Sequence, residues 1–174
     1  MKLVQSLFCS NISALLNKLK RFSKGGLDII SKYVSKTLEV VFTLLRNKDY
    51  NIYNYGLLCI SSLVSATNID QQSIQIFDKD SLNLLLTDFV YSGLTSMNVG
   101  VINSACCLIG NLYYFLGNKE PILHDLAGDI FTTLSSLIIL NKEIRDIHPL
   151  IMKAISDMFC NLNIDEDLCK LELP

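Results

Sequence analysis

Apolar residues recur along this chain at intervals of three and four rather than two, which is the spacing of helices that bury one side. One template, with apolar residues at i, i+4, i+7, i+8 and i+11, fits four times, starting at positions 8, 56, 105 and 151. A second template, at i, i+3, i+4, i+7 and i+8, fits three times between them, starting at positions 34, 82 and 130. The pattern therefore predicts helices and almost nothing else.

The two templates share one period. Successive starts are 48, 49 and 46 residues apart for the first template, and 48 and 48 residues apart for the second. The first template predicts A helices near residues 2–21, 50–67, 98–116 and 146–163. The second predicts B helices near residues 28–46, 79–95 and 122–140. The segment NIDQQSIQIFDKD, residues 68–80, is left as the one long loop.

The last A helix shows how such a helix begins. Asp146 can cap its first amides, and Pro149 then falls in the first turn, where a missing amide hydrogen costs little. An acid followed closely by a proline is thus explained as a helix start.

A period in the high forties with two helices per unit is typical of HEAT repeats, whose helical pairs bury their apolar sides only by stacking on one another. We therefore expect an all-α fold, a right-handed HEAT-repeat superhelix (α-solenoid) of about three and a half helical hairpins. The single segment divides into repeats near residues 1–48, 49–96, 97–144 and, in part, 145–174. The ends of a solenoid need polar outer faces. Because the first helix carries Leu3, Val4, Leu7 and Phe8, we expect a piece of a longer array.

Composition and charge exclude several classes of function. Half of the residues are apolar and 18% are charged, with a net charge of −2, which argues against nucleic acid as a partner. The richest apolar runs, LNLLLTDFVY and LSSLIIL, are too short and too interrupted for membrane insertion. Polar residues also interrupt the first helix, against a signal peptide. The charge is uneven: residues 1–27 carry five basic residues and no acid, whereas the C-terminal end holds Asp165, Glu166, Asp167 and Glu172.

No motif in the chain points to catalysis. The six cysteines include no CxxC pair, and only two histidines accompany them, which argues against zinc. Cys59, Cys106 and Cys160 fall in apolar helical patterns, so we expect them to be reduced and buried. A glycine-rich phosphate loop, GxSxG and HExxH are all missing. We expect a protein that is not an enzyme and that uses neither a cofactor nor a small-molecule substrate.

Four segments resemble consecutive A helices in the C-terminal half of the importin beta family of nuclear transport receptors. In order, they are LVQSLFCSNISALLNKL, NIYNYGLLCISSLVSAT, NSACCLIGNLYYFLG and EIRDIHPLIMKAISDMF. The resemblance implies a receptor of the cytoplasm, the nucleus and the nuclear pore, with A helices on the convex face and B helices on the concave face. It also implies three kinds of protein partner: basic import cargo or the basic arm of an adaptor, the Ran GTPase, and phenylalanine-glycine nucleoporins.

The resemblance suggests candidate contact residues on both kinds of helix. For a basic partner on the B helices they are Glu39, Asp80, Asp88 and Asp129, with Tyr91 nearby. Tyr114 on an A helix is the candidate for a phenylalanine slot, or else for packing on a neighbouring repeat. The acids also fit an ordinary solvated surface. Two other readings of the whole chain stay open: a HEAT-repeat scaffold or regulatory subunit of another complex, and a compact helical bundle that encloses an apolar ligand.

Overall fold

The computed structural model describes residues 2–19, 23–47, 49–69, 72–73, 76–140 and 147–162, and nearly all of them are helical. The helices are α1 (Lys2–Leu19), α2 (Ser23–Leu45), α3 (Tyr50–Thr67), α4 (Lys79–Leu84), α5 (Tyr91–Leu94), α6 (Val99–Leu116), α7 (Pro121–Asp125), α8 (Ala127–Leu140) and α9 (His148–Asn161). A π-helical stretch, η1 (Leu85–Val90), joins α4 to α5. The expected all-α fold is confirmed.

Side-chain caps begin several of these helices where the sequence predicts a start. The Asp49 carboxylate accepts hydrogen bonds from the amides of Asn51 and Ile52, at 3.0 and 3.3 Å, just before α3. The Asn98 side chain accepts from the amide of Val101 at 3.2 Å at the start of α6. Each cap satisfies amides that have no partner within the helix. At α9, Pro149 lies in the first turn as predicted, whereas Asp146 falls outside the described residues.

The expected long loop contains a short hairpin. Strands β1 (Asn68–Ile69) and β2 (Gln72–Ser73) pair antiparallel, with Asn68 opposite Ser73. Just beyond them, Ile76 and Phe77 are buried. Ile76 and Phe77 therefore hold the chain just before α4 against the helices.

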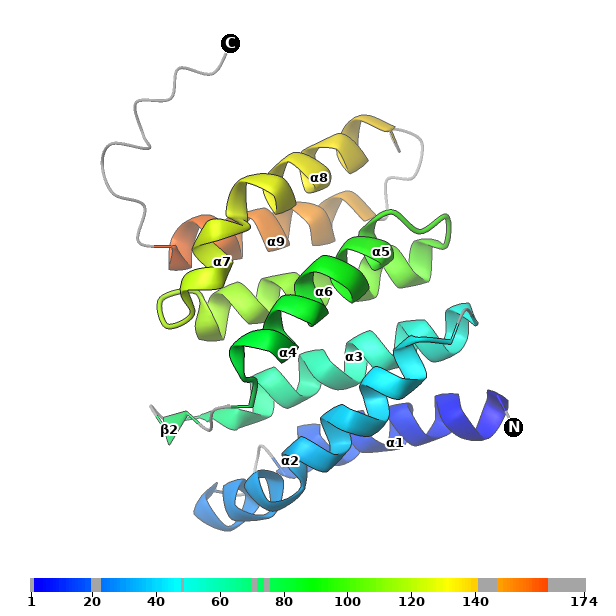
Figure 1. Ribbon diagram of the computed structural model, residues 1–174, viewed down its shortest axis with the longest axis vertical. Coiled ribbons are helices and arrows are strands. Elements are labelled where there is room, and N and C mark those ends of the chain that lie inside the picture. The colour runs from blue at the N-terminus through cyan, green and yellow to red at the C-terminus, as the bar shows by residue number, and fades with distance from the viewer. Residues whose placement is uncertain are drawn as a thin grey trace.

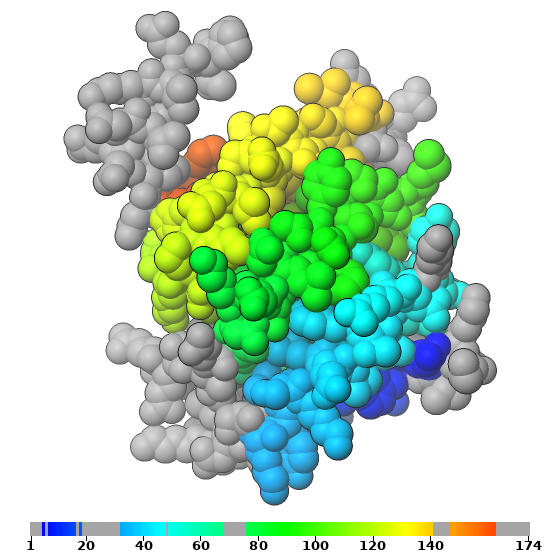
Figure 2. All heavy atoms as spheres, in the orientation of Figure 1, coloured from blue at the N-terminus to red at the C-terminus, as the bar shows by residue number. Residues whose placement is uncertain are grey.

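The helices form two layers (Figure 1). The A layer consists of α1, α3, α6 and α9, each packed on the next in chain order. The B layer consists of α2, then α4, η1 and α5, then α7 and α8; Figure 2 shows its outer face. The layers meet where α2 packs on α3, α5 on α6 and α8 on α9. Every helix thus shares a core with its neighbours.

Polar contacts across the A layer repeat with the period of the sequence. The hydroxyls of Ser13 and Ser62, 49 residues apart, share a hydrogen bond of 2.6 Å between α1 and α3. Between α3 and α6, the Asn111 amide donates to the Ser61 hydroxyl at 2.8 Å, across 50 residues. Equivalent turns of successive A helices therefore lie side by side.

Small residues allow the two layers to approach closely. A Cβ atom at Gly56 of α3 would lie 2.7 Å from the Leu45 side chain of α2. One repeat later, a Cβ atom at Gly93 of α5 would lie 3.0 Å from that of Ala105 in α6. The two B-layer partners, Leu45 and Gly93, are 48 residues apart, and the two A-layer partners, Gly56 and Ala105, are 49 residues apart. The same crossing of two helices therefore recurs one period later.

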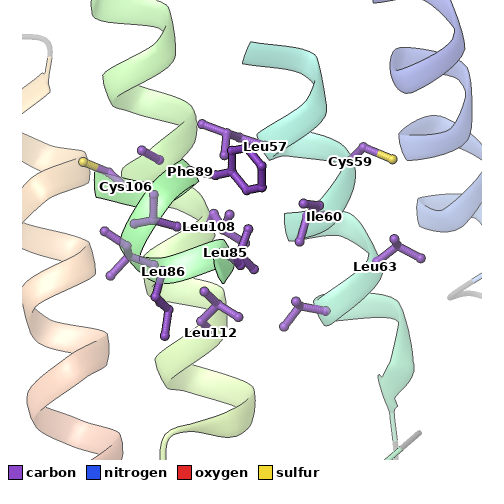
Figure 3. Packing of buried hydrophobic residues seen from close by; sticks show 14 of the residues in the cluster. Leu57, Cys59, Ile60, Leu63, Leu85, Leu86, Phe89, Cys106, Leu108 and Leu112 are labelled. Atoms are coloured by element: carbon purple, nitrogen blue, oxygen red, sulfur yellow. The ribbon is translucent and has the colours of Figure 1, made fainter. Parts of the chain in front are cut away.

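The core lies between the layers, where apolar residues of α3, η1 and α6 converge (Figure 3). All five template residues of α3 and of α6 are buried, as predicted. In the two outermost A helices the prediction is wrong in part, because Phe8 and Leu15 of α1 and Phe159 of α9 are 39%, 53% and 50% exposed. No described helix packs on the far side of α1 or α9, so one flank of each stripe faces outward.

One described helix, α6, is long and apolar enough to cross a bilayer by length and composition alone. It lies between α3 and α9, and 61% of it is buried inside the protein. Its place at the centre of the A layer accounts for its apolar composition, since a core helix is apolar on most sides.

Candidate protein-binding site

The structure gathers most of the predicted contact residues on one face. Five of them are exposed on the B layer: Glu39 on α2, Asp80 on α4, Asp88 on η1, Tyr91 on α5 and Asp129 on α8. Tyr114 is 59% exposed but lies on α6 in the A layer, where its ring meets the edge of Phe115 at 4.8 Å between centroids. Tyr114 is therefore not part of the same surface.

A groove of about 390 Å³ runs between η1 and α5 on one side and α8 on the other. Tyr91 and Asp129 both line it, the first from α5 and the second from α8. Its floor is apolar and is built from buried side chains that include Leu86, Val90 and Ile130. We call it the Tyr91–Asp129 groove. It combines an apolar floor with an aromatic ring on one wall and a carboxylate on the other.

The hydroxyl groups on the walls of this groove bond within their own helices. Thr132 donates to the Gly128 carbonyl at 2.8 Å, and Thr133 donates to the Asp129 carbonyl at 2.8 Å. The ion pair of Lys153 with Asp157 on α9, at 2.6 Å, lies outside the groove. The Asp129 carboxylate is exposed on α8 and is not paired with a described cation, so it can meet a positive group of a partner.

A second groove, of about 520 Å³, lies between α2 and the start of α4. Glu39 and Asp78 both line it, and Phe42 and Phe77 provide its apolar part. We call it the Glu39–Asp78 groove. The predicted residue Asp80 is exposed nearby on α4 but does not line it.

Asp78 is a lining residue that the sequence prediction missed. Its carboxylate accepts the Ser81 amide at 2.7 Å and caps α4. Hydrogen bonds from the Ser81 side chain and amide hold the pKa of Asp78 below its usual value, so the group is charged at neutral pH. Asp is a preferred N-cap residue, so Asp78 could have been recognised from the sequence as the cap of the helix that starts at Lys79.

The π-helical turn η1 connects the two grooves. The Phe42 ring, from the Glu39–Asp78 groove, stacks on Phe89 of η1 at 5.6 Å between centroids. The Tyr53 hydroxyl of α3 donates to the Phe89 carbonyl at 2.7 Å, and burial raises the pKa of Tyr53 to about 12. Single π-helical turns within α-helices are frequent at functional sites. Here η1 carries Asp88 and leads directly into Tyr91.

The cysteines do not form a metal-binding centre in the described part of the chain, where no three His, Cys, Asp or Glu residues gather. Cys59 and Cys106 are buried as predicted, and Figure 3 shows their sulfur atoms directed toward α1 and α9. Burial raises the pKa of Cys106 to about 12, which keeps it a thiol. The prediction for Cys160 is wrong: it is exposed, because it lies on a side of α9 that no described helix covers.

No family model matches the chain, and no curated protein and no solved structure matches it either. The resemblance to importin beta therefore stays a prediction that rests on the four A-helix segments.

Proposed function

We propose that this chain works by binding other proteins, as a HEAT-repeat segment of the importin beta type that holds a basic segment of cargo or adaptor on its B layer. The Tyr91–Asp129 groove is the observation that carries this proposal. It offers a positively charged side chain an apolar floor, an aromatic ring and a carboxylate at once.

The repeated contacts support the HEAT-repeat part of the proposal. A solenoid requires that each unit meets the next in the same way. The contacts of Ser13 with Ser62 and of Ser61 with Asn111 meet this requirement, and so do the crossings at Gly56 and Gly93. Two layers in chain order also fit stacked pairs better than a bundle around an enclosed ligand. The right-handed superhelical twist belongs to the proposal.

An arginine side chain fits the Tyr91–Asp129 groove chemically. Its alkyl stem covers the apolar floor, as long basic side chains do on apolar surfaces. Its guanidinium then meets the Asp129 carboxylate in a charge-assisted hydrogen bond and the Tyr91 ring in a cation–π contact. The carboxylates of Asp88, Asp80 and Glu39 extend the negative surface, which raises the association rate and selects basic partners.

The resemblance extends the proposal to the other partners of the family. Ran would displace the basic segment from the B layer, and phenylalanine-glycine nucleoporins would bind on the A layer. Tyr114 supports the second contact, since it is an exposed ring on that layer. The chain would then act in the cytoplasm, the nucleus and the nuclear pore.

Binding measured by fluorescence anisotropy tests the proposal with three probes: a labelled basic import-arm peptide, Ran loaded with GTP, and a phenylalanine-glycine repeat peptide. We expect the basic peptide to bind and to weaken as salt rises. Asp129→Lys should weaken that binding by about tenfold or more, because it replaces an attraction by a repulsion. Tyr114→Ala should affect only the phenylalanine-glycine peptide.

Glu120→Lys is the matched control, since it makes the same charge reversal in the turn before α7, outside both grooves. If Asp129→Lys and Glu120→Lys weaken basic-peptide binding equally, net charge and not the groove is responsible. If none of the three probes binds, the proposed binding by this segment is refuted, and the chain is then a spacer segment of such a receptor or a scaffold of another kind.

A further inference from the structure

Two buried cysteines face one another between the first two A helices. Cys9 of α1 and Cys59 of α3 are both fully buried, and both are free thiols. α1 packs directly on α3, and Figure 3 shows the Cys59 sulfur directed toward α1. A hydrogen bond joins the two thiols. The two sulfur atoms are therefore in contact inside the core.

The register of the A layer explains why these two residues meet. Three hydrogen bonds between side chains of successive A helices join residues that are 49 or 50 positions apart. Cys9 and Cys59 are 50 positions apart and so share this register. About one helical turn further along the same two helices, the hydroxyls of Ser13 and Ser62 meet at 2.6 Å. The contact between the thiols thus belongs to the repeated packing of the A helices.

The same close approach suits a disulfide. Cysteine, like serine, carries a single heavy atom beyond Cβ, and a disulfide joins Cβ atoms about 3.5–4.5 Å apart. Side chains of this length meet only where two helices come close, as α1 and α3 do. Cys106 of α6 provides the contrast, because its sulfur is directed toward α9, where the described cysteine, Cys160, is exposed. Cys106 is therefore buried without a cysteine against it on α9.

The hydrogen bond makes the two thiols unequal. Accepting this bond lowers the pKa of Cys9, and the opposite effect of burial is smaller. Donating the bond raises the pKa of Cys59, and burial raises it further. Cys9 is therefore the thiol that ionises first, and the thiolate is the form that peroxides oxidise.

We propose that Cys9 and Cys59 form a disulfide when the protein meets a peroxide, so that the pair is a site of reversible oxidation between two consecutive repeats. The Cys9 thiolate attacks one oxygen of hydrogen peroxide. An S–O bond forms, the O–O bond breaks, and the departing hydroxide takes up a proton to become water. The Cys59 thiol then attacks the sulfur of the resulting sulfenic acid. The S–S bond forms as the S–O bond breaks, and the hydroxyl group leaves with the thiol proton as a second water.

The electrons balance within these two steps, since one peroxide is reduced to two waters while two thiols are oxidised to one disulfide. Because both thiols are buried, peroxide reaches Cys9 only when α1 and α3 separate locally, so oxidation is slower than at the exposed Cys160. Cys59 reacts from inside the core and needs no contact with solvent.

The disulfide fixes α1 against α3 and so joins two repeats through their A helices. It closes a loop of about 50 residues in the unfolded chain, which lowers the entropy of that state and stabilises the folded one. This modification lies in the A layer and is independent of what the B layer binds.

Peptide mapping without reduction tests the proposal. The folded protein is treated with hydrogen peroxide at low protein concentration, and the monomer is isolated by size exclusion and digested with trypsin. Cleavage at lysine and arginine places Cys9 in the peptide of residues 3–18 and Cys59 in that of residues 49–79. We expect these two peptides to be joined and to separate on reduction with dithiothreitol. The Tm of the oxidised protein should rise and should return to its first value on reduction.

Cys106→Ala is the matched control for Cys9→Ala, since each variant removes one buried cysteine. The joined peptides and the rise in Tm should persist in Cys106→Ala and vanish in Cys9→Ala. Far-UV circular dichroism checks that both variants fold, and Cys9→Ser is the second choice if Cys9→Ala does not.

Oxidation of Cys160 without any joining of the two peptides would overturn the proposal. So would joining no more frequent than between other cysteine peptides, because that is the result expected of an unfolded chain. A joined protein whose Tm is unchanged or lower would refute the stabilising cross-link between α1 and α3.

Discussion

Gly117 lies directly after α6, in close contact with the last turn of α9. A Cβ atom at this position would lie 2.5 Å from the Tyr113 carbonyl oxygen and 2.7 Å from the Asn161 carbonyl oxygen. Both neighbours are backbone atoms, so Gly117→Ala can be accommodated only if the end of α6 or the end of α9 moves. Gly128 in α8 offers the matched case, because nothing lies within 4 Å of a Cβ atom there.

The two substitutions should change stability in opposite directions. Overpacking of this kind costs about 1–3 kcal/mol. Replacing a helical glycine by alanine gains about 0.5–1 kcal/mol from the smaller entropy of the unfolded chain. For Gly117→Ala the balance is a loss of up to about 2.5 kcal/mol, and for Gly128→Ala only the gain remains. At about 2–4 °C per kcal/mol for a chain of this size, Tm should fall by up to about 10 °C in the first variant and rise by about 1–4 °C in the second.

Urea and thermal unfolding, followed by far-UV circular dichroism, measure both changes. Hydrogen exchange of the α9 amides shows whether the strain loosens α9 alone or the whole stack. A Gly117→Ala variant that is as stable as Gly128→Ala, or more stable than the parent, would refute the close approach of α6 and α9 at this position.

Three further outcomes follow from burial. The pKa of Tyr53 is raised to about 12 by burial, whereas an unfolded tyrosine titrates near about 10. The stabilisation that comes from keeping Tyr53 protonated is therefore present below about pH 10 and lost as pH rises toward 12. In Tyr53→Phe, the free energy of unfolding in urea should fall less steeply with pH over this alkaline range. In the native protein a thiol reagent should modify the exposed Cys160 quickly and the buried Cys59 only on unfolding. Mass mapping of the labelled peptides measures the order, and modification of Cys59 first would contradict the prediction. Leu112→Ala should lower the free energy of unfolding in urea by about 2–5 kcal/mol, because Leu112 is buried. Leu15→Ala, at the equivalent template position but 53% exposed, should lower it by less than about 1 kcal/mol. Equal losses would contradict the difference in burial.

The helix positions were largely predictable because they depend on local features. α3 spans Tyr50–Thr67, the predicted range, and α6 starts one residue later than predicted, after the Asn98 cap. Apolar spacing, caps and prolines act over a few residues, so one sequence contains them in full. What local features did not predict is the π-helical turn η1, the break between α7 and α8, and the pairing of β1 with β2.

Exposure at the ends of the stack was harder to predict. Periodicity identifies the side of a helix that is apolar, but it does not say whether another helix covers that side. Leu15, Phe159 and Cys160 fit the same templates as buried residues, yet they are exposed because α1 and α9 each have one flank without a described neighbour. Their exposure is a property of the assembly of helices.

The sequence by itself determined that the chain is helical, where its helices lie, and that acids project from the B helices. These properties come from hydrogen bonds and side-chain spacing within single helices. Only the tertiary structure decided which of these residues share a site. Tyr91 and Asp129, 38 residues apart, line one groove because α5 packs against α8, and Asp78 joins Glu39 because α4 starts beside α2. Tyr114 is separated from them because its helix belongs to the other layer, and only the packing of the two layers places it there.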